Sequence, residues 1–350
     1  MGFLGAPDFG CIQPGMHDES RLSKVAKATL YERVVTDGYL KFKDIATGEN
    51  AKYIPVLANV PSDLFGVALA TACGEVWAAG DCDVPFALQS VSKPFTAALC
   101  IEQEGSAQCL LDKIGVANTG FPFNSILATQ FFGYPSVNPM LNAGAIASAS
   151  MIQGGNAAQR FETLLNWYMR CSGSTLSMLT DVYKSEAASN YNNRALAYIL
   201  AAAGRVYCDP LEATDLYTRQ CSIGVTVKQL VQMGATLANH GTNPVTRERV
   251  IRSQYIPCIL SMMMLSGLYE ESGQWAFTTG IPAKTGVGGG MVAIVPGTLA
   301  IAAFSPRLNQ AGNSIRAMGV VRHIAEQLRI NVFDASACTR SMVEQSKKKG

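Results

Sequence analysis

The sequence predicts a mixed α/β (α+β) fold in which one antiparallel sheet is flanked by helices and joined to a helical lobe. Two hairpin patterns lie far apart in the chain, one toward each end, and helical patterns fill most of the chain between them. Hydrophobic residues make up 48% of the 350 residues and charged residues 15%, which indicates a globular chain with a large core and not a disordered one.

The N-terminal part of the chain predicts a loose extension, a helix and a hairpin. Residues 1–22 contain Gly, Pro and polar residues without periodicity. From residue 23 onward apolar residues recur at helical spacing. Residues 65–71 and 76–79 are two short apolar runs, and residues 73–75 between them supply the turn.

The middle of the chain is predicted to be mainly helical. Residues 161–169 have helical periodicity. Residues 193–203 are apolar nearly all round, so we expect a helix that is buried on every side. Thr226 is the expected N-cap of a helix that runs to Leu237.

A second hairpin and a final helix are predicted near the C-terminus. Residues 290–295 and 299–304 are apolar runs that flank a Pro-Gly turn, and residues 315–328 have helical periodicity. The simplest fold places both hairpins in one sheet covered by the first and last helices, with the active site in the cleft between two lobes. The expected division is a loose extension at 1–22, a sheet lobe from 23–88 and 270–335, a helical lobe from 89–269, and a tail at 336–350.

Charge, cysteine and histidine usage argue against several classes of protein. The net charge is +2 and the basic run is confined to residues 347–349, so no nucleic-acid partner is expected. The ten cysteines include no Cys-x-x-Cys pair and are expected to be free thiols. His17, His240 and His323 form no metal-ligand pattern, so neither a metal nor another cofactor is expected. Without a signal peptide or an apolar run of membrane-spanning length, a cytoplasmic protein is expected.

The first candidate catalytic motif is Ser90-Val91-Ser92-Lys93, which follows the first hairpin. A serine hydroxyl needs a neighbouring base to act as a nucleophile. The three-residue spacing on a helix places Ser90 and Lys93 on one face. Lysine can act as that base if burial or a nearby cation lowers its pKa. The motif alone is weak, because the same pattern recurs at residues 346–349.

The second motif is Lys284-Thr285-Gly286, just before the late hairpin. An early Ser-x-x-Lys followed by a late Lys-Thr-Gly is the pattern of the penicilloyl-serine enzymes. The glycine-rich stretch 286–290 lacks the strand–loop–helix setting of a phosphate-binding loop. We expect it to allow a close approach of the backbone to a ligand, with amide groups that form an oxyanion hole.

With these two motifs and several further stretches, the sequence resembles the glutaminase family, whose domain is similar to the serine β-lactamases. The matching stretches run in family order over residues 37–330 and are Tyr53-Ile54-Pro55, Gln89 to Lys93, Asn138 to Ile146, Ser185 through Asn193, Tyr217 through Ile223, Ala235 to Asn239, Gly267-Leu268-Tyr269, Pro282 to Val287, Phe304-Ser305-Pro306 and Gly312-Asn313-Ser314. The resemblance implies a serine β-lactamase-like fold and the hydrolysis of L-glutamine to L-glutamate and ammonia.

The resemblance also implies roles in catalysis. Ser90 is the implied nucleophile and Lys93 its base. Tyr269 is expected beside them, where it helps to shuttle the proton. The backbone amides of Ser90 and Val287 are expected to form the oxyanion hole. An acyl-enzyme would release ammonia first, and water would then release glutamate.

The implied substrate pocket is lined by nine residues: Tyr53, Gln89, Ser90, Asn142, Glu186, Asn193, Tyr217, Tyr269 and Val287. Their chemistry suits free glutamine, which is a zwitterion. Glu186 is the candidate partner of the α-ammonium group. Asn142, Asn193 and Tyr217 can supply neutral donors to the α-carboxylate.

The sequence departs from the family pattern in three places. Residues 117–120 stand where members usually have Glu-Pro-Ser-Gly, Gly224 replaces a usual Glu, and His240 replaces a usual Gly. None is an implied catalytic position, so we expect any effect of the loop at 117–120 and of the turn at Gly224 to fall on assembly or regulation. Without ankyrin repeats the chain resembles the short microbial form, and the family suggests a homodimer or homotetramer.

Two other functions share some of these features. An enzyme acting on penicillin-like or peptidoglycan substrates would use the same two motifs, but Glu186 and Asn193 stand where it would carry Ser-Asp-Asn. A catalytically silent scaffold would keep the fold alone. The retention of both Ser90 and Lys93 argues against that second alternative.

Overall fold

The structure is a computed structural model that describes residues 24–127, 129 and 138–334. The predicted N-terminal extension and the predicted tail from residue 336 lie outside the described residues. In the described part of the chain, no helix combines the length and the apolar character needed to span a membrane.

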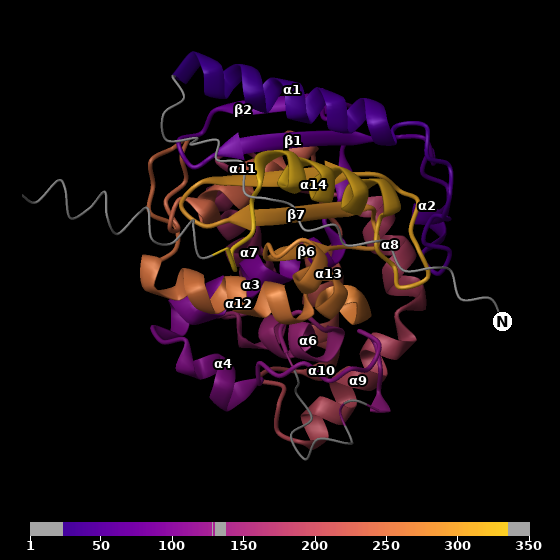
Figure 1. Cartoon of the computed structure of the whole chain (residues 1–350). Coiled ribbons are helices and arrows are strands. Elements are labelled where there is room, and N and C mark those ends of the chain that lie inside the picture. The colour runs from indigo at the N-terminus through magenta and orange to yellow at the C-terminus, as the bar shows by residue number, and fades with distance from the viewer. Residues whose placement is uncertain (1–23, 128, 130–137, 335–350) are drawn as a thin grey trace, which may run out of the picture.

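A five-stranded antiparallel sheet forms one side of the molecule, in the order β2-β1-β8-β7-β6 (Figure 1). The strands are β1 (Gly66–Thr71), β2 (Val76–Gly80), β6 (Ala283–Thr285), β7 (Gly290–Val295) and β8 (Leu299–Phe304). The two predicted hairpins meet because β1 pairs with β8, with Gly66 opposite Phe304. The prediction of both hairpins in one antiparallel sheet is therefore confirmed.

Helices cover both faces of this sheet. The helices α1 (Lys24–Phe42) and α14 (Ile315–Leu328) pack against each other and against one face, as predicted (Figure 1). On the other face lies α11 (Val227–Ala238), whose Gly234 lets it approach closely, since an added Cβ would come within 2.8 Å of Ala300 Cβ. Because both faces are covered, β7 and β8 are continuous apolar runs that are buried at every residue.

The predicted N-cap at Thr226 is confirmed. Its hydroxyl accepts a hydrogen bond from the backbone of Gln229, and the Gln229 side chain accepts one from the backbone of Thr226. This capping box satisfies two amide groups that the first turn of a helix leaves free. It fixes the start of the helix that joins the sheet to the helical part of the molecule.

The helix α6 (Asn142–Met151) is buried along its whole length. The remaining helices pack around it or against one another. They are α2 (Pro55–Ala58), α3 (Lys93–Glu104), α4 (Gln108–Lys113), α7 (Ala157–Ser172), α8 (Thr180–Ser189), α9 (Tyr191–Ala202), α10 (Pro210–Cys221), α12 (Ile256–Ser266) and α13 (Ser272–Thr278). A small sheet of β3 (Phe86–Ala87), β5 (Ile223–Val225) and β4 (Ser177–Met178) lies next to them. Small residues in α6 allow this close packing, because a Cβ at Gly144 would collide with the Asn138 carbonyl.

The expectation that residues 193–203 form a helix buried on every side is wrong. In α9 the buried residues are Leu196, Ala197 and Leu200, whereas Tyr191 and Tyr198 are exposed. The helix packs one face against α6 and α10 and turns the other toward solvent. Tyrosine has a polar end that solvent can satisfy, so its presence in an apolar run does not require burial.

Arg316 joins α14 to the chain segment that precedes the sheet. It is 2% exposed. Its guanidinium donates hydrogen bonds to the backbone carbonyls of Lys43, Ser62, Asp63 and Leu64 and to the hydroxyl of Ser305. A planar group with five N–H donors can satisfy several carbonyls at once, which a smaller polar residue cannot do.

Replacing Arg316 with methionine is expected to lower the free energy of unfolding by about 3 kcal/mol, because it leaves buried carbonyls without donors. Urea denaturation measures the change. The matched control is Arg307→Met, which removes a pair with the exposed carboxylate of Asp63. It is expected to cost less than about 1 kcal/mol. Equal losses in the two variants would contradict this account of Arg316.

Candidate active site

The candidate site is a cavity of about 120 Å³ where Ser90 meets the ends of several helices. Its lining residues are Tyr53, Ile54, Gln89, Ser90, Phe123, Asn124, Asn142, Glu186, Ser189, Asn190, Asn192, Asn193, Tyr217 and Val287. Eight of the nine residues predicted to bind substrate are in this set. The ninth, Tyr269, lies beside Ser90 and is hydrogen-bonded to it.

Ser90 lies in a short 3₁₀ turn, Gln89–Ser92, that leads directly into α3. Gln89 has a φ of 48°, a left-handed conformation that L-residues adopt at a cost. The Ser92 hydroxyl holds the turn, because it donates to the Gln89 carbonyl at 2.6 Å and accepts from Gln220 Nε2 at 2.9 Å. These contacts keep the strained turn in place and fix the Ser90 side chain at the cavity.

Lys93 is the first residue of α3 and is 1% exposed. Its Nζ donates to Asn142 Oδ1 at 2.8 Å and lies 5.7 Å from the centre of the Tyr217 ring. Burial lowers the pKa of Lys93 to about 7, although Cys221 and Glu186 act in the opposite direction. A lysine with this pKa can accept a proton near neutral pH, as the Ser-x-x-Lys motif requires.

Tyr269 also has a left-handed backbone, with a φ of 56°. Its hydroxyl is hydrogen-bonded to Ser90 and lies 3.4 Å from the Thr285 carbonyl oxygen. The ring of Phe123 packs against it with a centroid separation of 4.5 Å. Because burial raises its pKa, Tyr269 is a neutral phenol that can both donate and accept a proton.

The chain after β6 passes directly beside the Ser90 turn. A Cβ at Gly286 would lie 2.9 Å from the Leu88 carbonyl oxygen and 3.1 Å from the Ser90 nitrogen. A Cβ at Gly288 would lie 2.6 Å from the Ala87 carbonyl oxygen. Only glycine permits this approach, which brings the backbone of Val287 next to that of Ser90.

Glu186 reaches the cavity from α8 and is 6% exposed. Its Oε2 accepts a hydrogen bond from Gln89 Nε2 at 3.0 Å. Burial raises the pKa of Glu186 to about 7, although Gln89 and Lys93 lower it in part. A cation that entered the cavity would favour the charged carboxylate.

The opposite polar wall is a chain of hydrogen bonds centred on Asn142. Its Oδ1 accepts from Lys93 Nζ and, at 3.2 Å, from the Tyr217 hydroxyl. Its Nδ2 donates to Asn193 Oδ1 at 3.0 Å. Tyr53 lies at the rim and is 58% exposed. The predicted binding residues therefore gather around one cavity, with Asn142 in contact with the predicted base.

Sequence reasoning missed several residues of the site. Ser189, Asn190 and Asn192 line the cavity and fall between Glu186 and Asn193, so the matching stretch contained a signal for them. Phe123 and Asn124 had no such signal, because they reach the site from a loop without a motif. Cys221 is a further buried neighbour, with a thiol in contact with Tyr217.

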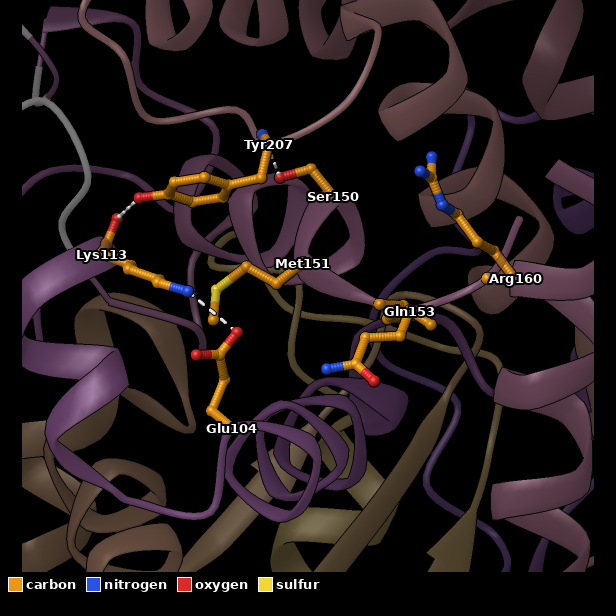
Figure 2. A pocket seen from close by; sticks show the side chains of 9 residues that line it. Glu104, Lys113, Ser150, Met151, Gln153, Arg160 and Tyr207 are labelled. Carbon is orange, nitrogen blue, oxygen red and sulfur yellow. Dashed lines mark hydrogen bonds and ion pairs between the residues drawn. The ribbon is translucent and has the colours of Figure 1, made fainter. Parts of the chain in front are cut away.

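A second cavity, of about 320 Å³, lies at the ends of α4 and α6 (Figure 2). Its charged groups are already paired, since Lys113 Nζ lies 2.8 Å from Glu104 Oε1. Its serine, Ser150, donates to the Ala147 carbonyl and accepts from the Tyr207 amide. Because this hydroxyl serves the backbone and has no neighbouring base, the cavity at Ser90 is the candidate active site despite its smaller volume.

Comparisons with known proteins agree with one another. A family model described as Glutaminase matches residues 48–333. A Glutaminase of Mycobacterium ulcerans (strain Agy99) is 48% identical over 303 residues, 87% of this chain and 94% of the relative. Glutaminase 1 of Escherichia coli (strain K12) is 46% identical over 306 residues, 87% of this chain and 98% of the relative.

Solved structures give the same result. A structure described as a probable glutaminase has a TM-score of 0.86 at 45% identity and covers 88% of this chain and 99% of its own. A probable glutaminase of Bacillus subtilis has a TM-score of 0.78 at 28% identity and covers 87% of this chain and 97% of its own. The predicted serine β-lactamase-like α/β fold is confirmed by these likenesses.

Replacing Glu186 with glutamine is expected to stabilise the protein at alkaline pH. A buried carboxyl with a raised pKa adds stability that is fully present below its unfolded pKa of 4.5 and lost as the pH rises through about 7. The variant lacks this loss, so its stability relative to the wild type should increase over that pH range and then level off at roughly 3 kcal/mol.

Urea denaturation across this pH range measures the difference. The matched control is Glu248→Gln, whose carboxylate pairs with Arg170 at the surface. It should change the stability by less than about 1 kcal/mol. An advantage of Glu186→Gln that is already complete at acidic pH would show that its carboxyl is not destabilised by burial.

Proposed function

The chain belongs to the glutaminase family, and from this premise we propose that its Ser90 cleft hydrolyses L-glutamine to L-glutamate and ammonia through a seryl acyl-enzyme. The observation that carries the proposal is the group of Ser90, Lys93 and Tyr269 at one cavity, with a lysine whose pKa is lowered to about 7. Such a lysine is the base that a serine nucleophile needs near neutral pH.

In the acylation step, Ser90 Oγ attacks the side-chain carbonyl carbon of glutamine while its proton passes to the neutral amine of Lys93. The carbonyl oxygen becomes negative within reach of the amides of Ser90 and Val287. When the carbon–nitrogen bond breaks, the proton returns to the leaving nitrogen through the Tyr269 hydroxyl. Ammonia leaves, and the glutamyl group is esterified to Ser90.

In the deacylation step, water attacks the ester. Lys93, neutral once more, accepts a proton from that water, and the same pair of amides holds the negative oxygen. The ester bond breaks, Ser90 regains its proton, and glutamate is released. In each step Lys93 accepts a proton and then gives it back, which suits a base with a pKa near the working pH.

Recognition of the amino-acid end is assigned to the polar walls of the cavity. The substrate ammonium would pair with Glu186 and so favour its charged form. The substrate carboxylate would accept hydrogen bonds from Asn142, Asn193 and Tyr217. Asparagine is one methylene shorter, so the same anchoring would hold its amide carbon away from Ser90.

The pH dependence of kcat/KM follows from these roles. Lys93 must be neutral and Glu186 must be charged, and burial moves the pKa of each to about 7. Activity therefore rises as the pH increases through about 7. This rise is the acid limb of the pH profile. Its midpoint reflects the titration of both groups together, because the charge of each affects the pKa of the other.

We also propose that the chain is divided into two lobes. Residues 23–88 and 270–335 would form the sheet lobe and residues 89–269 the helical lobe, with Ser90 at their boundary. Support comes from two buried apolar clusters, one on each face of the five-stranded sheet. The helix α11 lies against the sheet although it belongs to the middle segment, so the two lobes would share a core.

Ser90→Ala is expected to lower ammonia release from L-glutamine by about 10⁴-fold or more, because no other group replaces the nucleophile. The matched control is Ser189→Ala, which removes another hydroxyl of the same cavity and should keep most of the activity. A parallel reaction with L-asparagine should be slow. Release that survives in Ser90→Ala would reject the mechanism, and no release by the wild type would reject the reaction.

We also propose that the chain works in the cytoplasm as a homodimer or homotetramer. Free cysteines throughout the described residues support a reducing compartment. Exposed aromatic side chains, with Phe277 84% and Phe333 66% exposed, support self-association. Sedimentation velocity should show a dimer or tetramer at micromolar concentration. A monomer across the whole concentration range would contradict the proposed assembly.

A further inference from the structure

Lys284, from the late Lys-Thr-Gly motif, has no role in the reaction proposed above. Its side chain nevertheless contacts Tyr269, which takes part in that reaction. Lys284 is on β6, an edge strand of the sheet, but its exposure is 0%. An ammonium group that is removed from water needs other partners to remain charged. Its contacts therefore show what this lysine can do.

The side chain of Lys284 is surrounded by acceptors that belong to the Tyr269 segment and its neighbours. Its Nζ donates to the Gly267 carbonyl at 2.9 Å and to the Thr285 carbonyl at 2.8 Å. The same nitrogen lies 4.2 Å from the centre of the Tyr269 ring, a cation–π contact. Gly267 precedes Tyr269 by two residues. The lysine therefore contacts both the ring of Tyr269 and the backbone just before it.

The two buried lysines of the site differ in how well they can carry a charge. Lys284 has two carbonyl oxygens and a close aromatic face. Lys93 has one amide oxygen at 2.8 Å and a ring centre at the longer distance of 5.7 Å. Two cations in one dry site repel each other, so the better-solvated amine keeps its proton and the other gives it up.

The other titratable groups around the two lysines do not change which of them carries the charge more easily. Glu186 faces Lys93 from α8, and Cys221 and Tyr217 face it from α10. Cys221 acts on Lys284 as well, and Tyr269 faces it from the segment before α13. Glu186 favours a charge on Lys93, but the ammonium of a bound amino acid would pair with that carboxylate and weaken this effect.

We propose that Lys284 is a positioning residue for the Ser90 reaction, whose ammonium fixes Tyr269 beside Ser90 and keeps Lys93 in its neutral form. The proposal rests on the hydrolysis proposed above. Burial lowers the pKa of both lysines, and the charge of Lys93 lowers that of Lys284 further. The two carbonyl acceptors and the face of the Tyr269 ring oppose this effect at Lys284, and a charge held there disfavours a second charge on Lys93.

The test is the pH profile of kcat/KM for ammonia release by Lys284→Met, which removes the charge and keeps the length of the side chain. Without the neighbouring cation, the acid limb is expected to move up by about one pH unit. Activity on that limb should fall about tenfold more than activity on the alkaline plateau. Displacement of Tyr269 should add a loss of kcat that is the same at every pH. Lys284→Arg, which keeps the charge, should return the limb toward its wild-type position.

Thr285→Val is the matched control. The Thr285 hydroxyl lies 3.3 Å from the same Gly267 carbonyl and donates to Asn313 Oδ1 at 2.6 Å. The variant thus disturbs the same segment without changing a charge. It should lower kcat and leave the acid limb where it is in the wild type.

An unmoved acid limb in folded Lys284→Met, or an equal shift in Thr285→Val, would overturn the proposal and leave Lys284 a structural residue. Lys284→Gln serves if the methionine variant does not fold. NMR of wild-type enzyme labelled with ¹³C at lysine Cε provides a test that needs no change at Lys284. One buried signal should be charged on the alkaline plateau, and another, assigned through Lys93→Met, should be neutral. Any other pattern contradicts the proposal, whereas a wild type that releases no ammonia refutes the proposed function instead.

Discussion

The site depends on the removal of water from Lys93. In water a lysine is protonated near neutral pH and cannot act as a base. Placed as the first residue of a buried helix, with one amide oxygen as its hydrogen-bond partner, the same amine has a pKa of about 7. The buried helix α6, which supplies Asn142, and the chain that passes close to the Ser90 turn at Gly286 help to exclude water from this group.

The buried active site contains strained backbone and a carboxyl group whose charge is unfavourable there. Gln89 and Tyr269 flank Ser90 with left-handed backbones, and Glu186 is a carboxyl held at a cost in stability. Each of the two left-handed residues is held by a nearby serine. The Ser92 hydroxyl holds the first turn, and Ser272 donates to the Tyr269 carbonyl while accepting from the Leu268 amide. A substrate ammonium would supply the positive charge that Glu186 lacks.

The parts of the fold that the sequence predicts well are those where local pattern and tertiary packing agree. Both hairpins, the capped helix at Thr226 and the last helix are of this kind. The error at α9 came from treating Tyr198, Ala202 and Ala203 as buried because they stand in an apolar run, whereas the structure exposes them. Ser90, Lys93 and Lys284 carry motifs and could be found, whereas Phe123 meets Tyr269 only through folding of the chain, which no local pattern records. The left-handed backbones of Gln89 and Tyr269 likewise arise from tertiary contacts.

Two of the three departures from the family pattern have physical consequences that local sequence does not reveal. His240 has a φ of 52°, which explains why glycine is usual at that position and what its replacement costs, on the order of 1 kcal/mol. Gly224 lies in β5 between β3 and β4, and an added Cβ would come within 2.9 Å of the Leu179 side chain. Since Leu179 directly precedes α8, a larger residue at Gly224 would press on the helix that carries Glu186. The expected effect of this departure therefore shifts from assembly toward the binding wall of the active site itself.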